Sequence, residues 1–593
     1  MLQDRLATRL PEKYLPWLLL GLSGLIGLYV NIAYNSTWQT PVEAGQILAG
    51  LVHYDKTNLQ YIYTLKTWTV LNQISALVLL AGFDENTASL VIVGLIGAVS
   101  LMALTAVIYA LSKNFLLALT APLFISLVWP DFGVIYPISY LQMFRHSTGL
   151  FGLVFVVLVL GLFSGGYRRA GSFCLGVAPA VHFTLGAWCI LIIALVLALD
   201  QKDLRQDLSG MAKYFFLGLL MTGVSFGNYY WETRELRLAG FTDNQEIIVN
   251  YLKNFDVHRR PVNFLHAGFY TGLIGAIISL IILLYKKGAE VNSPFFLKIF
   301  LVNFLLAGLI AVPSHFPDRW LPLQMLMPGR FININVVMFF PLLLGLLGRT
   351  NNHTIDRLDF AFLVLASLLL KLFFRITAIS EINLAGFSLN YLKLIFAVAL
   401  AASVVSVIST VSPDRFSGYL ENLSKPIGRL YAGSLLALTA VALIILGQPL
   451  FKPSKGKFHL DPVYETVAQE QGLLLLSTPL YDFVQLKTRR PILFNPYALD
   501  GLPYAPETVA GLNEMLEKIY GLSLRGTLAD KHKHQLLNLG LEKELWEERK
   551  KADWLKIRRE FGVKQILTKA DWRLDLPVVA RSARFILYAI PEK

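Results

Sequence analysis

Repeated apolar runs constrain this chain more than any other feature of its sequence. A helix of about 20 residues crosses the roughly 30 Å of bilayer hydrocarbon, and many runs here have about that length. They lie at residues 14–34, 88–111, 114–130, 146–165, 170–199, 211–231, 264–285, 296–313, 331–348, 359–377, 391–410 and 430–448. The sequence therefore predicts a mainly α, polytopic membrane protein.

The run at 170–199 is interrupted by "GVAPAVHFTLG", and we expect two short helices that meet at this Pro and Gly break. Counting them separately gives about 13 transmembrane helices. Basic loops favour the cytoplasmic side. Placing the loops around Arg168, Lys286, Arg349 and Lys425 there predicts a cytoplasmic N-terminus, provided that residues 61–82 do not cross the membrane.

Residues 61–82 carry Lys66, Asn72 and Gln73 within an otherwise apolar stretch. Such an amphipathic pattern is typical of a helix that lies on a membrane surface. We therefore expect residues 35–87 to form one large outer loop that contains amphipathic helices.

The composition changes at Phe451, after which the chain is charged and of ordinary globular character. Apolar strand patterns at 472–476, 491–494, 565–568 and 584–590 alternate with helical patterns at 461–470, 507–520 and 531–562. The sequence predicts a transmembrane domain over 1–450 and a small soluble α/β domain over 451–593, on the outer (periplasmic or extracytoplasmic) side of the membrane.

The net charge of +13 could indicate nucleic-acid binding, but no array of basic and aromatic residues supports it. In a membrane protein, excess Lys and Arg instead mark cytoplasmic loops and anionic headgroups. Cys174 and Cys189 both fall in apolar runs, which indicates neither a disulfide framework nor a metal site.

One carboxylate, Glu43, follows Pro41 at the start of a predicted helix in the outer loop. The helix dipole favours an ionised carboxylate there, as a general base requires. The alternative is that Glu43 only caps its helix. Asp55, in "VHYDKTN", offers a second acid.

Basic residues recur in later outer loops, where arginine is well shaped to bind phosphate. His258, Arg259 and Arg260 precede one predicted span, and His315, Arg319 and Arg330 lie in or near another outer loop. The alternative for the arginines is that they extend to generic lipid headgroups.

Further candidates for a cavity come from ionisable residues near or within the membrane. Arg145 and His146 lie at the outer mouth of a predicted span, and His182 lies at the break within 170–199. Ionisable residues inside membrane proteins are candidates for function, although a single His at a helix break, such as His182, is more often a structural hydrogen-bonding group.

The whole layout resembles the GT-C-type membrane glycosyltransferases: one span, a long outer loop with an early acid, many further spans and a soluble outer domain. Such enzymes move a sugar from a polyprenyl-phosphate carrier to a hydroxyl at the outer face. The resemblance implies Glu43 as base or metal ligand, and His258, Arg259 and Arg260 as the phosphate site, with Arg319 or Arg330 as further candidates. The acceptor would be a glycan, lipid or protein in cell-envelope polysaccharide or glycoconjugate biosynthesis.

This chain departs from the pattern of two adjacent acids, because Val42 and Ala44 flank Glu43. The resemblance therefore leaves the cofactor open, with a divalent cation, Mg or Mn, as one alternative. Two other functions also stay open: a transporter or translocase of a lipid-linked sugar, which would favour paired broken helices, and a non-catalytic glycan-binding membrane protein. We expect the protein in a bacterial inner or plasma membrane.

Overall fold

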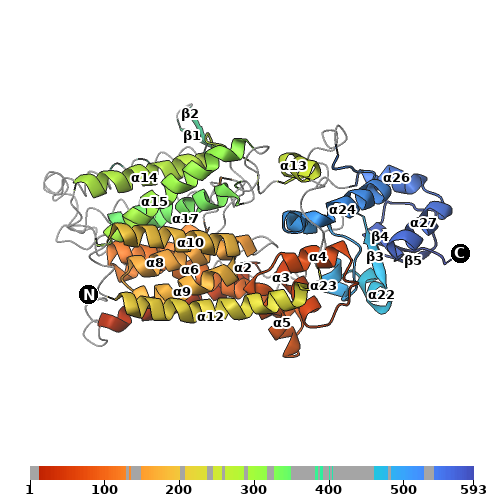
Figure 1. Ribbon diagram of the computed structural model, residues 1–593, viewed down its shortest axis with the longest axis horizontal. Coiled ribbons are helices and arrows are strands. Elements are labelled where there is room, and N and C mark those ends of the chain that lie inside the picture. Colours follow the sequence, from red (N-terminus) through yellow and green to blue (C-terminus); the bar gives the residue numbers. More distant parts are fainter. Residues whose placement is uncertain are drawn as a thin grey trace.

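The computed structural model shows a bundle of long helices with a small mixed domain at one end (Figure 1). It describes residues 12–35, 37–127, 133–134, 148–200, 207–236, 245–256, 259, 261–285, 292–316, 323, 326–348, 381–384, 387–390, 400, 404, 460–477, 483–525 and 540–592. The expected spans at 359–377 and 430–448 lie outside the described residues, as does most of the one at 391–410.

The bundle contains ten helices that match ten of the expected spans. They are α2 (Leu15–Asn35), α6 (Glu85–Ser112), α7 (Phe115–Leu127), α8 (Thr148–Ser164), α9 (Arg168–Val181), α10 (Phe183–Leu199), α12 (Leu208–Thr233), α14 (Ala267–Tyr285), α15 (Pro294–Ala311) and α17 (Pro328–Leu347). Within the described part of the chain, six helices are long and apolar enough to cross a membrane, namely α2, α6, α12, α14, α15 and α17. The structure supports an integral membrane protein but does not confirm the count of 13.

The expected break within 170–199 is present, because α9 ends at Val181 and α10 begins at Phe183. His182 between them has an extended backbone. The two helices fold back on each other, and a Cβ on Gly186 would lie 2.4 Å from the backbone of Ala178.

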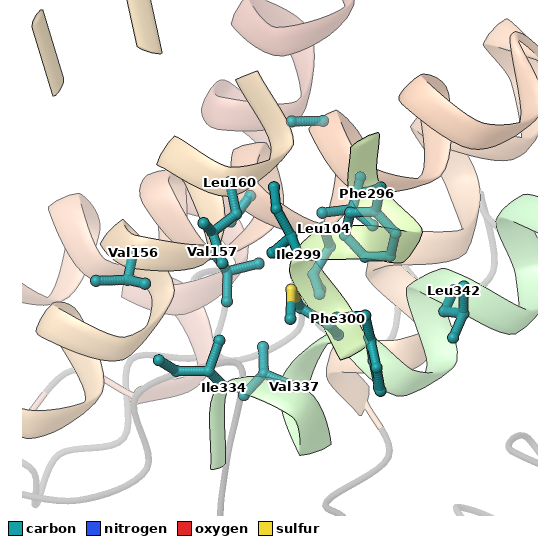
Figure 2. Close-up of a cluster of buried hydrophobic side chains, with 14 of the residues drawn as sticks. Leu104, Val156, Val157, Leu160, Phe296, Ile299, Phe300, Ile334, Val337 and Leu342 are labelled. Atoms are coloured by element: carbon teal, nitrogen blue, oxygen red, sulfur yellow. The ribbon is translucent and has the colours of Figure 1, made fainter. Parts of the chain in front are cut away.

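Apolar side chains from distant parts of the sequence fill the centre of the bundle. Figure 2 shows part of this cluster, with side chains of α6, α8, α15 and α17: Leu104, Val156, Val157, Leu160, Phe296, Ile299, Phe300, Ile334, Val337 and Leu342. These side chains form a close-packed core that holds the four helices together.

The first outer loop forms three short helices, α3 (Thr40–Leu48), α4 (Leu59–Lys66) and α5 (Val70–Leu80). The stretch 61–82 is thus two helices rather than one. The break falls at Thr69, whose hydroxyl accepts from the backbone N–H of Leu71 and caps α5. Another short helix, α13 (Gln245–Asn254), lies in the loop that follows α12.

The C-terminal domain is a four-stranded mixed sheet with helices around it. The strands are β3 (Leu473–Leu476), β4 (Val563–Lys569), β5 (Val578–Arg581) and β6 (Phe585–Ala589), in the order β3-β4-β6-β5. The helices are α22 (Val463–Gln469), α23 (Val484–Thr488), α24 (Val509–Met515), α26 (Glu542–Glu548) and α27 (Lys551–Phe561). A separate hairpin joins β1 (Glu381–Leu384) to β2 (Phe387–Asn390).

Two strand predictions need correction. Residues 491–494 make only one bridge, between Leu474 and Ile492, so they do not extend the sheet. The strand β5 was not predicted, because its residues are mostly exposed and lack the alternation of a half-buried strand. The helix expected over 531–562 is two helices, α26 and α27, in its described part.

The C-terminal domain packs against the outer loops rather than standing apart from them. One cluster of buried side chains joins Tyr63 of α4 and Tyr251 of α13 to Leu516 and Trp546 of the C-terminal domain. In Figure 1, α3, α4 and α23 lie between the bundle and the C-terminal sheet. The outer loop is therefore enclosed between the two parts of the molecule.

Candidate functional site

Glu43 lies in the first turn of α3, two residues after Pro41. Its side chain is only 5% exposed, and its Oε1 atom has no hydrogen-bond partner among the described residues. Burial raises the pKa of this carboxyl to about 8. We expected the dipole of α3 to keep this carboxylate ionised. Desolvation has the larger effect on its pKa, because a buried charge loses its contact with water. The group holds its proton below about pH 8, and once ionised it is a stronger base than an ordinary carboxylate.

Two neighbours hold α3 in place. Gly45 packs against α5 so closely that a Cβ there would lie 2.6 Å from the Cβ of Ser75. On another side, Gln485 of α23 donates from Nε2 to the backbone oxygen of Glu43 at 3.0 Å. The buried carboxyl therefore sits on a helix fixed by both the outer loop and the C-terminal domain.

Arg330 and His182 form the second part of the candidate site. Arg330 lies in the first turn of α17, and its Nη1 donates to Nε2 of His182 at 3.0 Å. Because a guanidinium only donates, Nε2 must accept. On the other side of the ring, the backbone N–H of Leu185 and the hydroxyl of Thr184 lie 3.5 Å and 3.2 Å from Nδ1.

Two further donors near the start of α17 have no partner among the described residues. Nε of Arg330 and Nδ2 of Asn333 are buried, and neither has a hydrogen-bond partner in the described part of the chain. Residues three apart share one face of a helix. These two donors and the positive end of α17 together favour an anionic or oxygen-rich ligand.

A buried polar network fixes the start of α17. The Trp188 indole stacks on Phe331 at 4.1 Å, and its Nε1 donates to Asn303. Asn303 donates in turn to the backbone oxygen of Phe331 at 2.9 Å and to Oδ1 of Asn335. Since Phe331 follows Arg330, the network orients the turn that carries the guanidinium.

The two parts of the site lie at the same end of the bundle. Val42, Leu71, Val181 and Phe483 belong to one cluster of buried side chains, so the neighbours of Glu43 and His182 share a core. The hydroxyl of Thr69 also donates to the backbone oxygen of Val181 at 2.8 Å. This contact links the loop helix α5 to the break that carries His182.

Strained backbone accompanies both parts. Four non-glycine residues in the described ranges have a left-handed backbone, and three of them flank site segments: Met327 before α17, and Phe483 and Arg489 at the ends of α23. Each such residue costs about 1–3 kcal/mol, and strain of this kind gathers at functional sites.

Arg259, a predicted phosphate ligand, is buried and forms an ion pair with Asp256. Its backbone N–H also donates to Oδ1 of Asp256, and its guanidinium lies 5.3 Å from the ring of Tyr504. Through these contacts Arg259 connects the loop after α13 to the C-terminal domain. A phosphate ligand would have to compete with Asp256.

Asp55 and His315 make local contacts. The Asp55 carboxylate is exposed and accepts from the N–H and hydroxyl of Thr57, which lowers its pKa. His315 donates from Nε2 to the backbone oxygen of Val262 at 3.1 Å and stacks on Phe264. The other predicted site residues lie outside the described residues: Arg145, His146, His258, Arg260 and Arg319.

The described ranges contain no group of three His, Cys, Asp or Glu side chains that could hold a metal ion. Glu43 supplies one carboxylate, and Mg²⁺ in proteins is held through one or two carboxylates together with waters and substrate phosphates. We derive no step through a metal.

The sequence reasoning missed Asn303, Asn333, Asn335 and Gln485. The asparagines could have been noticed as polar residues within predicted spans, a pattern that marks functional or packing sites. Nothing in the sequence near Gln485 links it to residue 43, which is more than 400 positions away.

No family model matches this chain, and no curated protein matches it at a significant level. Among solved structures it is similar to ArnT from Cupriavidus metallidurans bound to undecaprenyl phosphate. That likeness has a TM-score of 0.45 and 13% sequence identity, and it covers 97% of this chain and 98% of that chain.

Proposed function

We propose that this protein is a membrane glycosyltransferase that moves a sugar from a polyprenyl-phosphate-linked donor to a hydroxyl acceptor. The buried carboxyl of Glu43, with its unpartnered Oε1, is the observation that carries the proposal. A buried acid without a partner destabilises a fold, and this one lies on an outer-loop helix held from two sides.

In the proposed reaction, the ionised Glu43 takes the proton of the acceptor hydroxyl. The acceptor oxygen then bonds to the anomeric carbon of the sugar as the bond from that carbon to the phosphate oxygen breaks. The leaving polyprenyl phosphate keeps the electron pair. Positive charge near that phosphate lowers the barrier, because the charge develops there in the transition state.

We assign this charge first to Arg330, supported by His182 and Asn333. Its Nε and the Asn333 Nδ2 are buried donors without partners, as a site for phosphate oxygens requires. Arg259 is ion-paired with Asp256, and we keep it, with His258, Arg260 and Arg319, as a secondary contact of the carrier. In this proposal the N-terminus is cytoplasmic, and the reaction and the C-terminal domain lie at the outer face of a bacterial inner membrane.

The test is release of polyprenyl phosphate by the purified protein from a panel of polyprenyl-phosphate sugars, with a hydroxyl acceptor present. Wild type is expected to release it, and Glu43→Gln to bind donor without doing so. Asp55→Asn is the matched control, because Asp55 is an exposed acid of the same loop, and we expect full activity from it. Failure of wild type with every donor would overturn the proposal.

A further inference from the structure

The short helix α23 brings the C-terminal domain into direct contact with α3. Gln485 is fully buried, and its Nε2 donates to the backbone oxygen of Glu43 at 3.0 Å and to Oε1 of Gln46 at 3.3 Å. Its Oε1 accepts from the hydroxyl of Tyr54 at 2.7 Å. Both polar atoms of this amide therefore serve to connect α23 to the outer loop.

The contact is reciprocal. Gln46, one turn further along α3, donates from Nε2 to the backbone oxygen of Leu486 at 3.0 Å and to Oε1 of Glu85 at 3.1 Å. Glu85 also accepts from Nε of Arg489 at 2.6 Å. Side chains on each segment thus bond the backbone of the other, which fixes the register between α3 and α23.

The backbone of α23 is shaped for this contact. Phe483 and Arg489, on either side of the helix, have φ of 51° and 53°, a conformation that costs energy for residues other than glycine. Phe483 and Leu486 lie in the same buried cluster as Val42. Strain that persists at both ends of a five-residue helix indicates that the surroundings impose it.

We propose that Gln485 is a positioning residue for Glu43, so that the C-terminal domain completes the site on the outer loop. This inference rests on the proposed function of Glu43. Gln485 does not touch the reacting atoms, and it acts by fixing the backbone from which the Glu43 side chain projects. A base misplaced by about 1 Å can lose a hundredfold in rate.

Charged and titratable groups on the segments that pack against α3 bear on the test. They are Tyr61, Tyr63 and Lys66 of α4, Glu85 and Tyr109 of α6, Lys487 of α23 with Arg489 at its end, and Tyr54 in the loop after α3. Glu85 and Arg489 form an ion pair, and the raised pKa of Glu43 has burial as its cause. A carboxylate introduced at position 485 would therefore add a charge effect on the pKa of Glu43 to the effect of burial.

The first experiment compares Gln485→Leu with wild type in the release assay. We expect kcat to fall at least tenfold while KM for the donor stays within twofold, because the donor phosphate binds elsewhere. Tyr63→Phe is the matched control: it removes the hydrogen bond to Thr508 across another part of the same boundary and is expected to leave kcat unchanged.

The second experiment measures the pH dependence of kcat/KM for Gln485→Glu. This variant keeps an acceptor for Tyr54 but adds a negative charge beside α3, which raises the pKa of Glu43. We expect the midpoint to move up by about one pH unit, because position 485 lies against the backbone of Glu43.

The outcomes separate the two proposals. An active wild type with a normal kcat for Gln485→Leu, or an unmoved midpoint for Gln485→Glu, overturns the positioning role alone. An inactive wild type overturns the proposed function. Should Gln485→Leu fail to fold, Gln485→Glu, which also lacks the Nε2 donor to Glu43, takes its place in the comparison of kcat with KM.

Discussion

The guanidinium of Arg330 lies 3.0 Å from Nε2 of His182, although the two residues are 148 positions apart. One begins a long helix and the other occupies the break between two short ones. Their contact assembles the basic part of the candidate site from α17 and from the α9–α10 turn.

Replacing Arg330 is expected to weaken donor binding. Arg330→Ala removes the charge and the free donor Nε, so KM for the donor is expected to rise about tenfold or more, as for the loss of a charge-assisted hydrogen bond. Steady-state kinetics of polyprenyl phosphate release measure this. Arg330→Lys keeps the charge and is expected to recover part of the loss, whereas an unchanged KM in both variants would move the phosphate site elsewhere.

A substitution at Gly152, which packs against His182, is expected to weaken donor binding by moving the imidazole. A Cβ on Gly152 would lie 2.5 Å from the Cβ of His182, so Gly152→Ala displaces the imidazole from Arg330. We expect a several-fold rise in donor KM from this variant. Gly223→Ala is the matched control, since no atom lies within 4 Å of a Cβ there. An equal donor KM in the two variants would argue against a role of the His182–Arg330 contact in donor binding.

The close packing of α2 on α6 depends on glycines, which have no side chain at the point of contact. A Cβ on Gly97 would lie 2.2 Å from the backbone oxygen of Gly27. Gly97→Ala is therefore expected to destabilise the protein by about 1–3 kcal/mol through overpacking. Thermal unfolding in detergent measures it, with Gly21→Ala, which faces open space, expected to match wild type.

Ionisation of Glu43 links stability to pH. Its pKa is raised from 4.5 to about 8 in the folded state, so the folded protein holds a proton that the unfolded chain releases between these values. Stability is therefore lost as pH rises through this window, by up to about 1.4 kcal/mol per pH unit. Glu43→Gln lacks the titrating group, so the difference between its thermal unfolding midpoint and that of wild type is expected to increase in its favour from pH 5 to pH 8. A difference that stays constant with pH would contradict the raised pKa of Glu43.

Much of the bundle could be predicted from the sequence, because apolar runs of membrane length carry their own signal. The break at His182 was predicted from Pro179 and the nearby glycines, and the structure places it there. The C-terminal strands β3, β4 and β6 were also predicted, since their buried residues form short apolar runs.

The site was predicted only in part. Glu43, His182 and Arg330 were selected from local sequence. The contact between His182 and Arg330 depends on helix packing that no local pattern encodes. Arg259 looked available for phosphate, yet Asp256, three residues earlier, binds it. The role of Gln485 depends on the fold of two distant segments.

The central claim, that Glu43 is the base, is tested most directly by the pH dependence of kcat/KM for wild type beside Glu43→Gln. We predict that wild-type kcat/KM rises about tenfold per pH unit below pH 8 and then levels off, near the pKa of about 8 that burial gives Glu43. Glu43→Gln is expected to lose activity at every pH. A flat wild-type profile, or an active Glu43→Gln, would contradict it.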